Sequence, residues 1–162
     1  MEKKVEKQAQ EIFMRFCNYL KKVNWQFDTD TTNGNFIILA SARGEDLPMN
    51  LIVQVDPQRQ LISLFSNMPF NMDKEKLLEG AVATSIINHL LADGSFDYDV
   101  HDGSILFRMT TSWRGGLISD EVFEYLMIVA CKTIDDYNDK LLMISKGAMS
   151  VDDLYKLTHK EG

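Results

Sequence analysis

The spacing of apolar side chains predicts four helices. Near the N-terminus, apolar residues recur at three- and four-residue steps between Lys and Glu residues, which is the pattern of a helix with one buried stripe. The same spacing predicts a second helix from Asp73 to Gly94 and a long third helix from Ser119 to about Lys146. A capping box that begins at Ser150 predicts a short last helix, because its hydroxyl and an acidic residue three positions later satisfy free backbone amides.

Residues between the first two helices follow the patterns of β-strands. Side chains alternate between apolar and polar over residues 49–55, and a further strand is predicted over residues 61–67, after the turn at Asp56-Pro57. Residues 36–42 are nearly all apolar, which favours a strand that is covered on both faces. Consecutive strands joined by short turns predict an antiparallel meander.

A second hairpin is predicted after the second helix. Residues 96–100 alternate apolar side chains with aspartates, Asp102-Gly103 is a two-residue turn signal, and residues 105–111 return as the partner strand. The order is helix, three or four strands, helix, two strands, long helix, short helix, which excludes a doubly wound parallel sheet. We therefore expect an α+β, two-layer sandwich in which helices pack on an antiparallel sheet of five to six strands. We expect residues 1–162 to form a single domain.

The composition is that of an ordinary globular protein with an excess of acidic residues. Hydrophobic residues make up 45% and charged residues 25% of the chain, and the formal net charge is -7. No nucleic-acid partner is expected, because binding to phosphate backbones draws most of its energy from basic side chains. The longest apolar run, Leu126 to Cys131, is far shorter than the ~20 residues that span a bilayer. The first residues are charged and have no apolar segment after them, so we expect no secretory signal. We expect a cytoplasmic protein without membrane insertion, in which Cys17 and Cys131 are reduced core thiols.

Titratable residues do not assemble into a recognisable catalytic or metal-binding motif. The histidines His89, His101 and His159 lack a local signature with a nucleophile and an orienting carboxylate, so we interpret them as surface residues. Counted from Asp97 or from Asp28, the calcium-loop pattern fails, because glycine is missing at position six and glutamate at position twelve.

Two further polar clusters are interpreted as structural. Arg114-Gly115-Gly116 lacks the lysine and hydroxyl of a phosphate-binding loop. Asp135, Asp136 and Asp139 are interpreted as a solvated face of the long helix, in preference to a paired-carboxylate site. We therefore predict no catalytic residue, no cofactor and no metal site.

The methionines carry the sharpest functional hint of the residues alone. The chain has nine, and the stretch Met-Pro-Phe-Asn-Met at residues 68–72 leaves a predicted strand. Methionine adapts to varied apolar partners and is over-used on binding surfaces; ordinary packing against the second helix is the alternative. The binding interpretation expects accessible side chains, with nearby carboxylates favouring a basic partner. The predicted partner-binding surface consists of Met68, Phe70, Met72, Trp113, Asp97 and Asp99.

A family resemblance is carried by residues 88–144. Its motifs are Asn88-His89-Leu90-Leu91, Phe96-x-Tyr98, Asp102-Gly103 before Ile105-x-Phe107-Arg108, Gly115-Gly116-x-Ile118-Ser119 and the long helix through Asp136-Tyr137. With the order of elements, these motifs resemble the YbjN family, sometimes labelled sensory transduction regulators, within the type III secretion chaperone-like fold. The resemblance implies a non-enzymatic protein, often dimeric, that binds other polypeptides or acts in regulation. It carries over no catalytic residue.

Two hypotheses of different classes follow. The first is a chaperone-like or regulatory module that holds a partner polypeptide on an apolar face of a homodimer. Burial of the predicted surface inside one chain would contradict the site assigned to it. The second is a small-ligand-binding protein or an enzyme with a pocket between the sheet and the helices. It requires convergent polar groups, such as His101 with Asp97 or Asp99, around a closed cavity.

Overall fold

Helices and strands follow one another in the predicted order. The computed structural model describes residues 2–159 and contains four α-helices and six β-strands within that range. They are α1 (Glu2–Lys22), β1 (Phe27–Asp30), β2 (Ile37–Arg43), β3 (Pro48–Asp56), β4 (Leu61–Asn67), α2 (Leu77–Leu90), β5 (Ser95–Tyr98), β6 (Ile105–Ser112), α3 (Asp120–Ser145) and α4 (Val151–Thr158). The expected α+β class and the order of elements are confirmed.

All six strands pair antiparallel in one sheet of order β1-β2-β3-β4-β6-β5. Strands β1 to β4 are consecutive neighbours, which confirms the predicted meander. The chain then leaves the sheet through α2, and β5 returns at the edge beyond β6. The result is one free edge at β1 and a second edge at β5, which α2 contacts.

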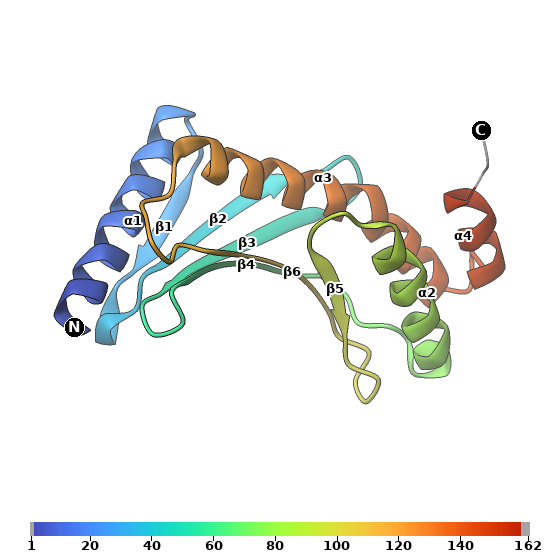
Figure 1. Cartoon of the computed structure of the whole chain (residues 1–162). Coiled ribbons are helices and arrows are strands. Elements are labelled where there is room, and N and C mark those ends of the chain that lie inside the picture. The colour runs from blue at the N-terminus through green and yellow to red at the C-terminus, as the bar shows by residue number, and fades with distance from the viewer. Residues whose placement is uncertain (1, 160–162) are drawn as a thin grey trace.

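The two long helices lie on the same face of the sheet (Figure 1). Helix α1 contacts β3 and α3, and α3 contacts β6. The rings of Phe16 in α1 and Phe123 in α3 stack with centroids 4.4 Å apart, and both side chains are fully buried. The strand side chains beneath them form the core, among them Ile38, Leu51, Val53, Ile62, Leu64, Phe107 and Met109. Burial of this apolar stripe is the main favourable contribution to folding.

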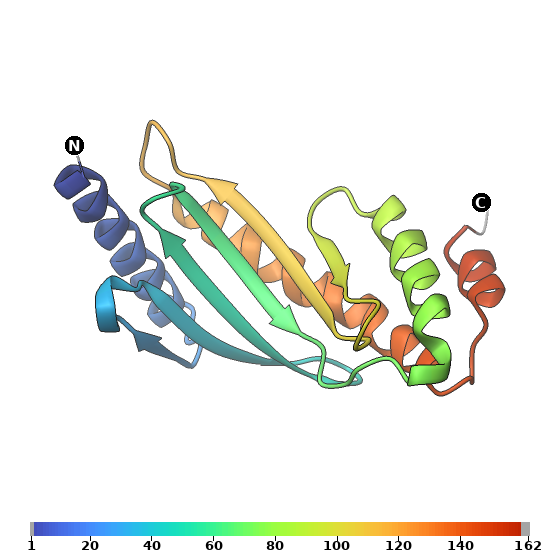
Figure 2. The ribbon, with the colours of Figure 1, turned by 90° about the horizontal axis from the view of Figure 1, so that it is seen from below.

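The opposite face of the sheet has no helix across it among the described residues, as Figure 2 shows from below. The expectation that residues 36–42 form a strand covered on both faces is therefore wrong. Burial alternates along β2: Ile38 and Ala40 are buried, whereas Leu39 between them is 43% exposed. The reason is that both long helices pack on one side, so only every second side chain of β2 meets the core.

The turn between β5 and β6 is longer than the two residues predicted. Tyr98 pairs with Ile105, which leaves six residues, 99–104, in the loop. The Asp99 carboxylate accepts a hydrogen bond from the amide of His101 at 2.8 Å, and the Asp102 carboxylate accepts one from the amide of Ser104 at 2.8 Å. These short-range bonds organise the loop locally, as aspartates in turns commonly do.

The two sides of the sheet predict unequal losses of stability when neighbouring residues are truncated. We expect Phe107→Ala to lower the free energy of unfolding by about 3–5 kcal/mol, because Phe107 is fully buried and packs edge-on against Phe96. Leu106→Ala, one residue away on the uncovered face, should cost only about 1 kcal/mol. Urea unfolding of both variants measures the difference. Equal losses would contradict the one-sided core.

Candidate functional site

Three of the six predicted partner-binding residues lie in the core. Met68, Met72 and Trp113 are only 6%, 3% and 1% exposed, and Phe70 is partly buried against the core. The accessibility that the sequence predicted for these residues is therefore wrong. The alternative of ordinary packing describes Met68 and Met72 correctly, and Met72 packs against the second helix as expected, because its Cγ would lie only 2.9 Å from a Cβ on Gly80 of α2.

Hydrogen bonds hold the segment from Met68 to Met72 against the hairpin of β5 and β6. The amide of Met68 donates to the carbonyl of Ile105 at 2.9 Å, and the amide of Met72 donates to the carbonyl of Gly103 at 2.8 Å. The amide of Asp73 donates to the Ser145 hydroxyl, at the end of α3, at 2.9 Å. The segment thus leaves β4 after Asn67 but stays bound to the β5–β6 hairpin, and its two methionines are buried in the core. The sequence could not reveal this, because the partners lie more than thirty residues away.

Asp97 and Asp99 do not extend a methionine surface. The Asp97 carboxylate lies 2.9 Å from the Arg108 guanidinium, an ion pair between β5 and β6 on the uncovered face. Asp99 serves the loop at the end of β5, and His101 is exposed in that loop. None of the three residues His101, Asp97 and Asp99 lines a hollow found among the described residues. The geometry required by the enzyme hypothesis is therefore not formed by these residues.

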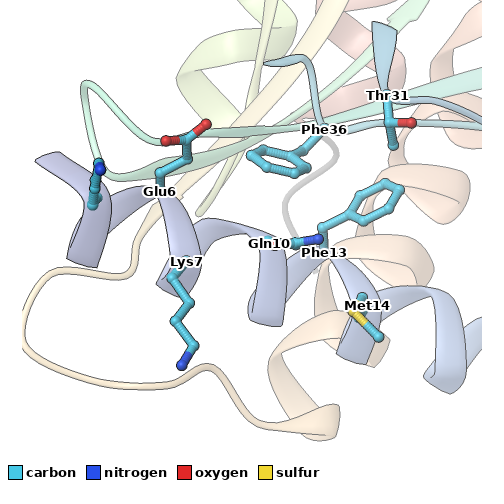
Figure 3. A pocket seen from close by; sticks show the side chains of 8 residues that line it. Glu6, Lys7, Gln10, Phe13, Met14, Thr31 and Phe36 are labelled. Carbon is cyan, nitrogen blue, oxygen red and sulfur yellow. The ribbon is translucent and has the colours of Figure 1, made fainter.

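A hollow of about 590 Å³ lies between α1 and the segment that joins β1 to β2 (Figure 3). Phe13 and Phe36 form its apolar side, with ring centroids 5.7 Å apart. Glu6 and Lys7 point to opposite sides of α1, so their charges do not converge. The hollow is open to solvent and has the mixed lining of an ordinary surface depression, which gives it no evident catalytic arrangement.

The aspartates of α3 have separate structural roles. The Asp135 carboxylate accepts a hydrogen bond from the amide of Glu45 at 2.8 Å, which ties the turn between β2 and β3 to α3. Asp136 pairs with Lys132 at 3.3 Å, and Asp139 lies 3.1 Å from Lys140. Only Asp136 matches the solvated face that the sequence predicted. Within residues 2–159, His, Cys, Asp and Glu side chains form no group of three or more suited to a metal ion.

A different surface combines apolar side chains with charges. We call the outward side chains of the six strands, on the side without helices, the open face. Its apolar members are Ile37, Leu39, Ile52, Leu61, Phe65 and Leu106, all half-buried or exposed. Polar side chains such as Ser63 and Thr110 lie among them. A hollow of about 490 Å³ lies on the β1–β3 part of this face, next to Asp28, Leu39 and Ile52.

The open face carries charges at its two sides and also at the ends of its middle strands, where Arg43 of β2 and Asp56 of β3 lie on the same side. Asp28 and Asp30 point outward from β1, the free edge. The Asp30 carboxylate accepts hydrogen bonds from both the hydroxyl and the amide of Thr32, which lowers the pKa of Asp30. Arg108 and Asp97 face outward on β6 and β5. The sequence analysis did not predict this surface. A usable signal was Ile52, an apolar residue at a position of the alternating strand 49–55 whose neighbours on the same side, Asn50 and Gln54, are polar.

Comparison with known proteins identifies the fold. No family model and no curated protein matches the chain. The crystal structure of YbjN, a candidate transcription regulator from E. coli, superposes with a TM-score of 0.52 over 81% of this chain and 87% of YbjN, at 12% sequence identity. The chain has the fold of YbjN. The expected resemblance is thus confirmed at the level of the fold, which is all that identity this low shows. None of the described helices is long and apolar enough to cross a membrane.

Two glycines test how the segment before α2 is held. Gly103 and Gly115 both have a positive φ, +73° and +82°, so alanine is strained by about 1–2 kcal/mol at either position. A Cβ on Gly103 would also lie 2.6 Å from the carbonyl oxygen of Met72, whereas nothing lies within 4 Å of one on Gly115. We expect Gly103→Ala to destabilise the chain by at least about 1 kcal/mol more than Gly115→Ala in urea unfolding. Similar losses would contradict the close contact with Met72.

The cysteines should behave as unreactive thiols. Burial, with a smaller contribution from the charge of Asp135, raises the pKa of Cys131 to about 11, so only about one thiol in a thousand is ionised at pH 8. We expect iodoacetamide to alkylate Cys131 in the folded chain on the order of 100-fold more slowly than free cysteine at pH 8. Mass spectrometry of the folded and the urea-unfolded chain measures both rates. Alkylation as fast as that of free cysteine would contradict the burial of the thiol.

Proposed function

We propose that this chain is a non-enzymatic, regulatory or chaperone-like module that binds a polypeptide through the open face of its sheet. One observation carries the proposal: six large apolar side chains lie at outward positions of a sheet that no described element covers, and four of them, Ile37, Leu39, Ile52 and Phe65, are neighbours on three adjacent strands. The outward positions of an antiparallel sheet with one wet side are normally polar. A contiguous exposed apolar patch with a polar rim marks an interaction surface.

The charges of the open face favour a protein partner over a nucleic acid. Its free edge presents Asp28 and Asp30, and the single cation near its opposite side, Arg108, is already paired with Asp97. Phosphate backbones require several unpaired basic side chains. A regulatory role of the kind suggested for YbjN would therefore act through protein contacts in this chain.

The properties of the titratable groups support a binding role in preference to catalysis. The pKa of the Cys17 thiol is raised by burial, as is that of Cys131, so neither is an activated nucleophile. Asp135 of α3 binds the amide of Glu45 in the turn between β2 and β3, and Asp136 and Asp139 form ion pairs with lysines of the same helix. Reduced thiols also fit the cytoplasmic location that we propose.

Site-specific photo-crosslinking in cells that produce the full chain tests the proposal. A benzophenone amino acid at Ser63, which pairs with Gln54 and Thr110 at the centre of the open face, should form adducts with a polypeptide identifiable by mass spectrometry. The matched control carries the same group at Lys132, on the solvent side of α3. Introducing Phe65→Ser beside the Ser63 probe should reduce the adducts at least about threefold, because that ring supplies much of the apolar area.

Absence of any polypeptide adduct at Ser63 above the Lys132 control would overturn the proposed function. So would adducts that persist unchanged with Phe65→Ser, since they would not depend on the apolar centre.

A further inference from the structure

We propose that the open face binds its polypeptide as an amphipathic α-helix, which lays an apolar stripe on the sheet and presents Lys or Arg residues to Asp28 and Asp30. This inference rests on the proposed function, because it names the conformation and the charge of the segment that the same surface binds. Three features of the face carry it: the pairing of its backbone, the size of its apolar centre and the position of its charges.

The backbone beneath the apolar centre offers no hydrogen bonds to an extended partner. At Leu39, Ile52 and Phe65 the strand is paired on both sides, so the local amides and carbonyls bond within the sheet. An extended segment laid over these side chains would bury its own amides and carbonyls without partners, which costs free energy for each group. A helix satisfies its backbone internally. Binding over the apolar centre therefore favours a helix.

The free edge of the sheet does not offer an extended partner another route to the same residues. A strand added beside β1 would find only four residues to pair with. It would also lie three strand positions from Ile52 and four from Phe65, roughly 14 and 19 Å away. Strand addition at β1 would therefore leave the apolar centre uncovered.

The apolar centre has the dimensions of one helix. Leu39, Ile52 and Phe65 lie in one register row on three adjacent strands, and Ile37 lies two residues from Leu39 along β2. Two strand spacings span roughly 10 Å, which is the diameter of a helix with its side chains. Strands β2 and β4 each have seven residues. That length, roughly 23 Å, corresponds to about 15 helical residues.

Two carboxylates without a basic partner lie along one side of this centre. Asp28 pairs with Leu39 and Asp30 with Ile37, so each carboxylate stands one strand from an apolar residue. Neither takes part in an ion pair among the described residues. The hollow of about 490 Å³ is lined by Asp28, Leu39 and Ile52. It suits the aliphatic stem of a Lys or Arg residue whose charged end reaches Asp28.

The cations of the open face do not supply the missing partner. Arg108 is paired with Asp97 at 2.9 Å. Arg43 lies six residues along β2 from Ile37, which places it roughly 20 Å from Asp30. A basic helix therefore brings Asp28 and Asp30 opposite charges, whereas an acidic helix would meet them with like charges. The face thus discriminates between helices by their charge.

Labelled peptides of known pattern test the inference by fluorescence anisotropy with the full chain. The probe has about 15 leucine and lysine residues, with leucines at the three- and four-residue steps of an amphipathic helix. One control peptide has the same residues in strict alternation, the pattern of a strand. The other replaces lysine with glutamate in the helical pattern. At ~0.15 M salt, the helical lysine peptide should bind at least about tenfold more tightly than either control.

Variants of the chain show whether the peptide binds at the open face. Asp28→Lys should weaken binding of the helical lysine peptide at least about fivefold, because it places like charges together, and Phe65→Ser should do the same by removing apolar area. Asp136→Lys makes the same change of charge on the solvent side of α3 and should alter the affinity less than about twofold. Asp28 and Asp136 are both exposed, so these two variants leave the core intact.

Two results with the peptides would overturn the inference. One is a helical lysine peptide that binds no more tightly than the alternating peptide or the glutamate peptide. The other is an affinity that Asp28→Lys leaves unchanged, since binding would then lie elsewhere on the chain.

The Ser63 adducts separate the failure of this inference from the failure of the proposed function. A polypeptide crosslinked at Ser63, together with peptides that show no preference for the helical pattern, leaves the proposed function standing and ends the inference. Adducts that join two copies of this chain would name a different occupant and would also end it. If Ser63 forms no adduct and no peptide binds, both fail.

Discussion

The contact between α1 and α3 decides which face of the sheet becomes the core. Phe16 and Phe123 stack at 4.4 Å from two helices that are separated by the whole sheet in the sequence. Because their rings are buried together, both helices must lie on the same face. The alternation of buried and exposed residues in β2, β3 and β4 follows from this choice, and so does the open face on the other side.

Periodicity predicted most of the fold. Helical spacing located α1, α2 and α3, and the capping box at Ser150 located α4, where the Ser150 hydroxyl accepts from the amide of Asp153 at 3.0 Å. Strand patterns located the meander and the hairpin. What periodicity could not supply was the number of covered faces. Residues 36–42 are apolar on both sides of β2, and a local pattern does not say that one of those sides lacks a helix.

The site was harder to predict than the fold, because its residues are defined by distant partners. In the sequence, Met68 and Met72 suggest an accessible apolar stretch. In the structure they are buried, and their amides donate to the carbonyls of Ile105 and Gly103. The open face shows the converse. Leu39, Ile52 and Phe65 are ordinary strand residues in the sequence, and only the register of two strand pairs, β2–β3 and β3–β4, sets them in one row. Composition is thus a weak guide to a surface that the pairing of strands assembles.

The brevity of β1 has a consequence for solubility. A sheet with an exposed apolar face and a free edge is at risk of joining other sheets side by side into fibrils. Strand β1 has only four residues, and two of its side chains are the outward carboxylates of Asp28 and Asp30. A further strand that added there would have to place its own side chains beside these charges and would find few backbone groups to pair with. Since the hydrogen bonds from Thr32 lower the pKa of Asp30, that carboxylate keeps its charge at a lower pH than an ordinary aspartate. The edge of the sheet therefore keeps part of its protection against fibril growth in mild acid.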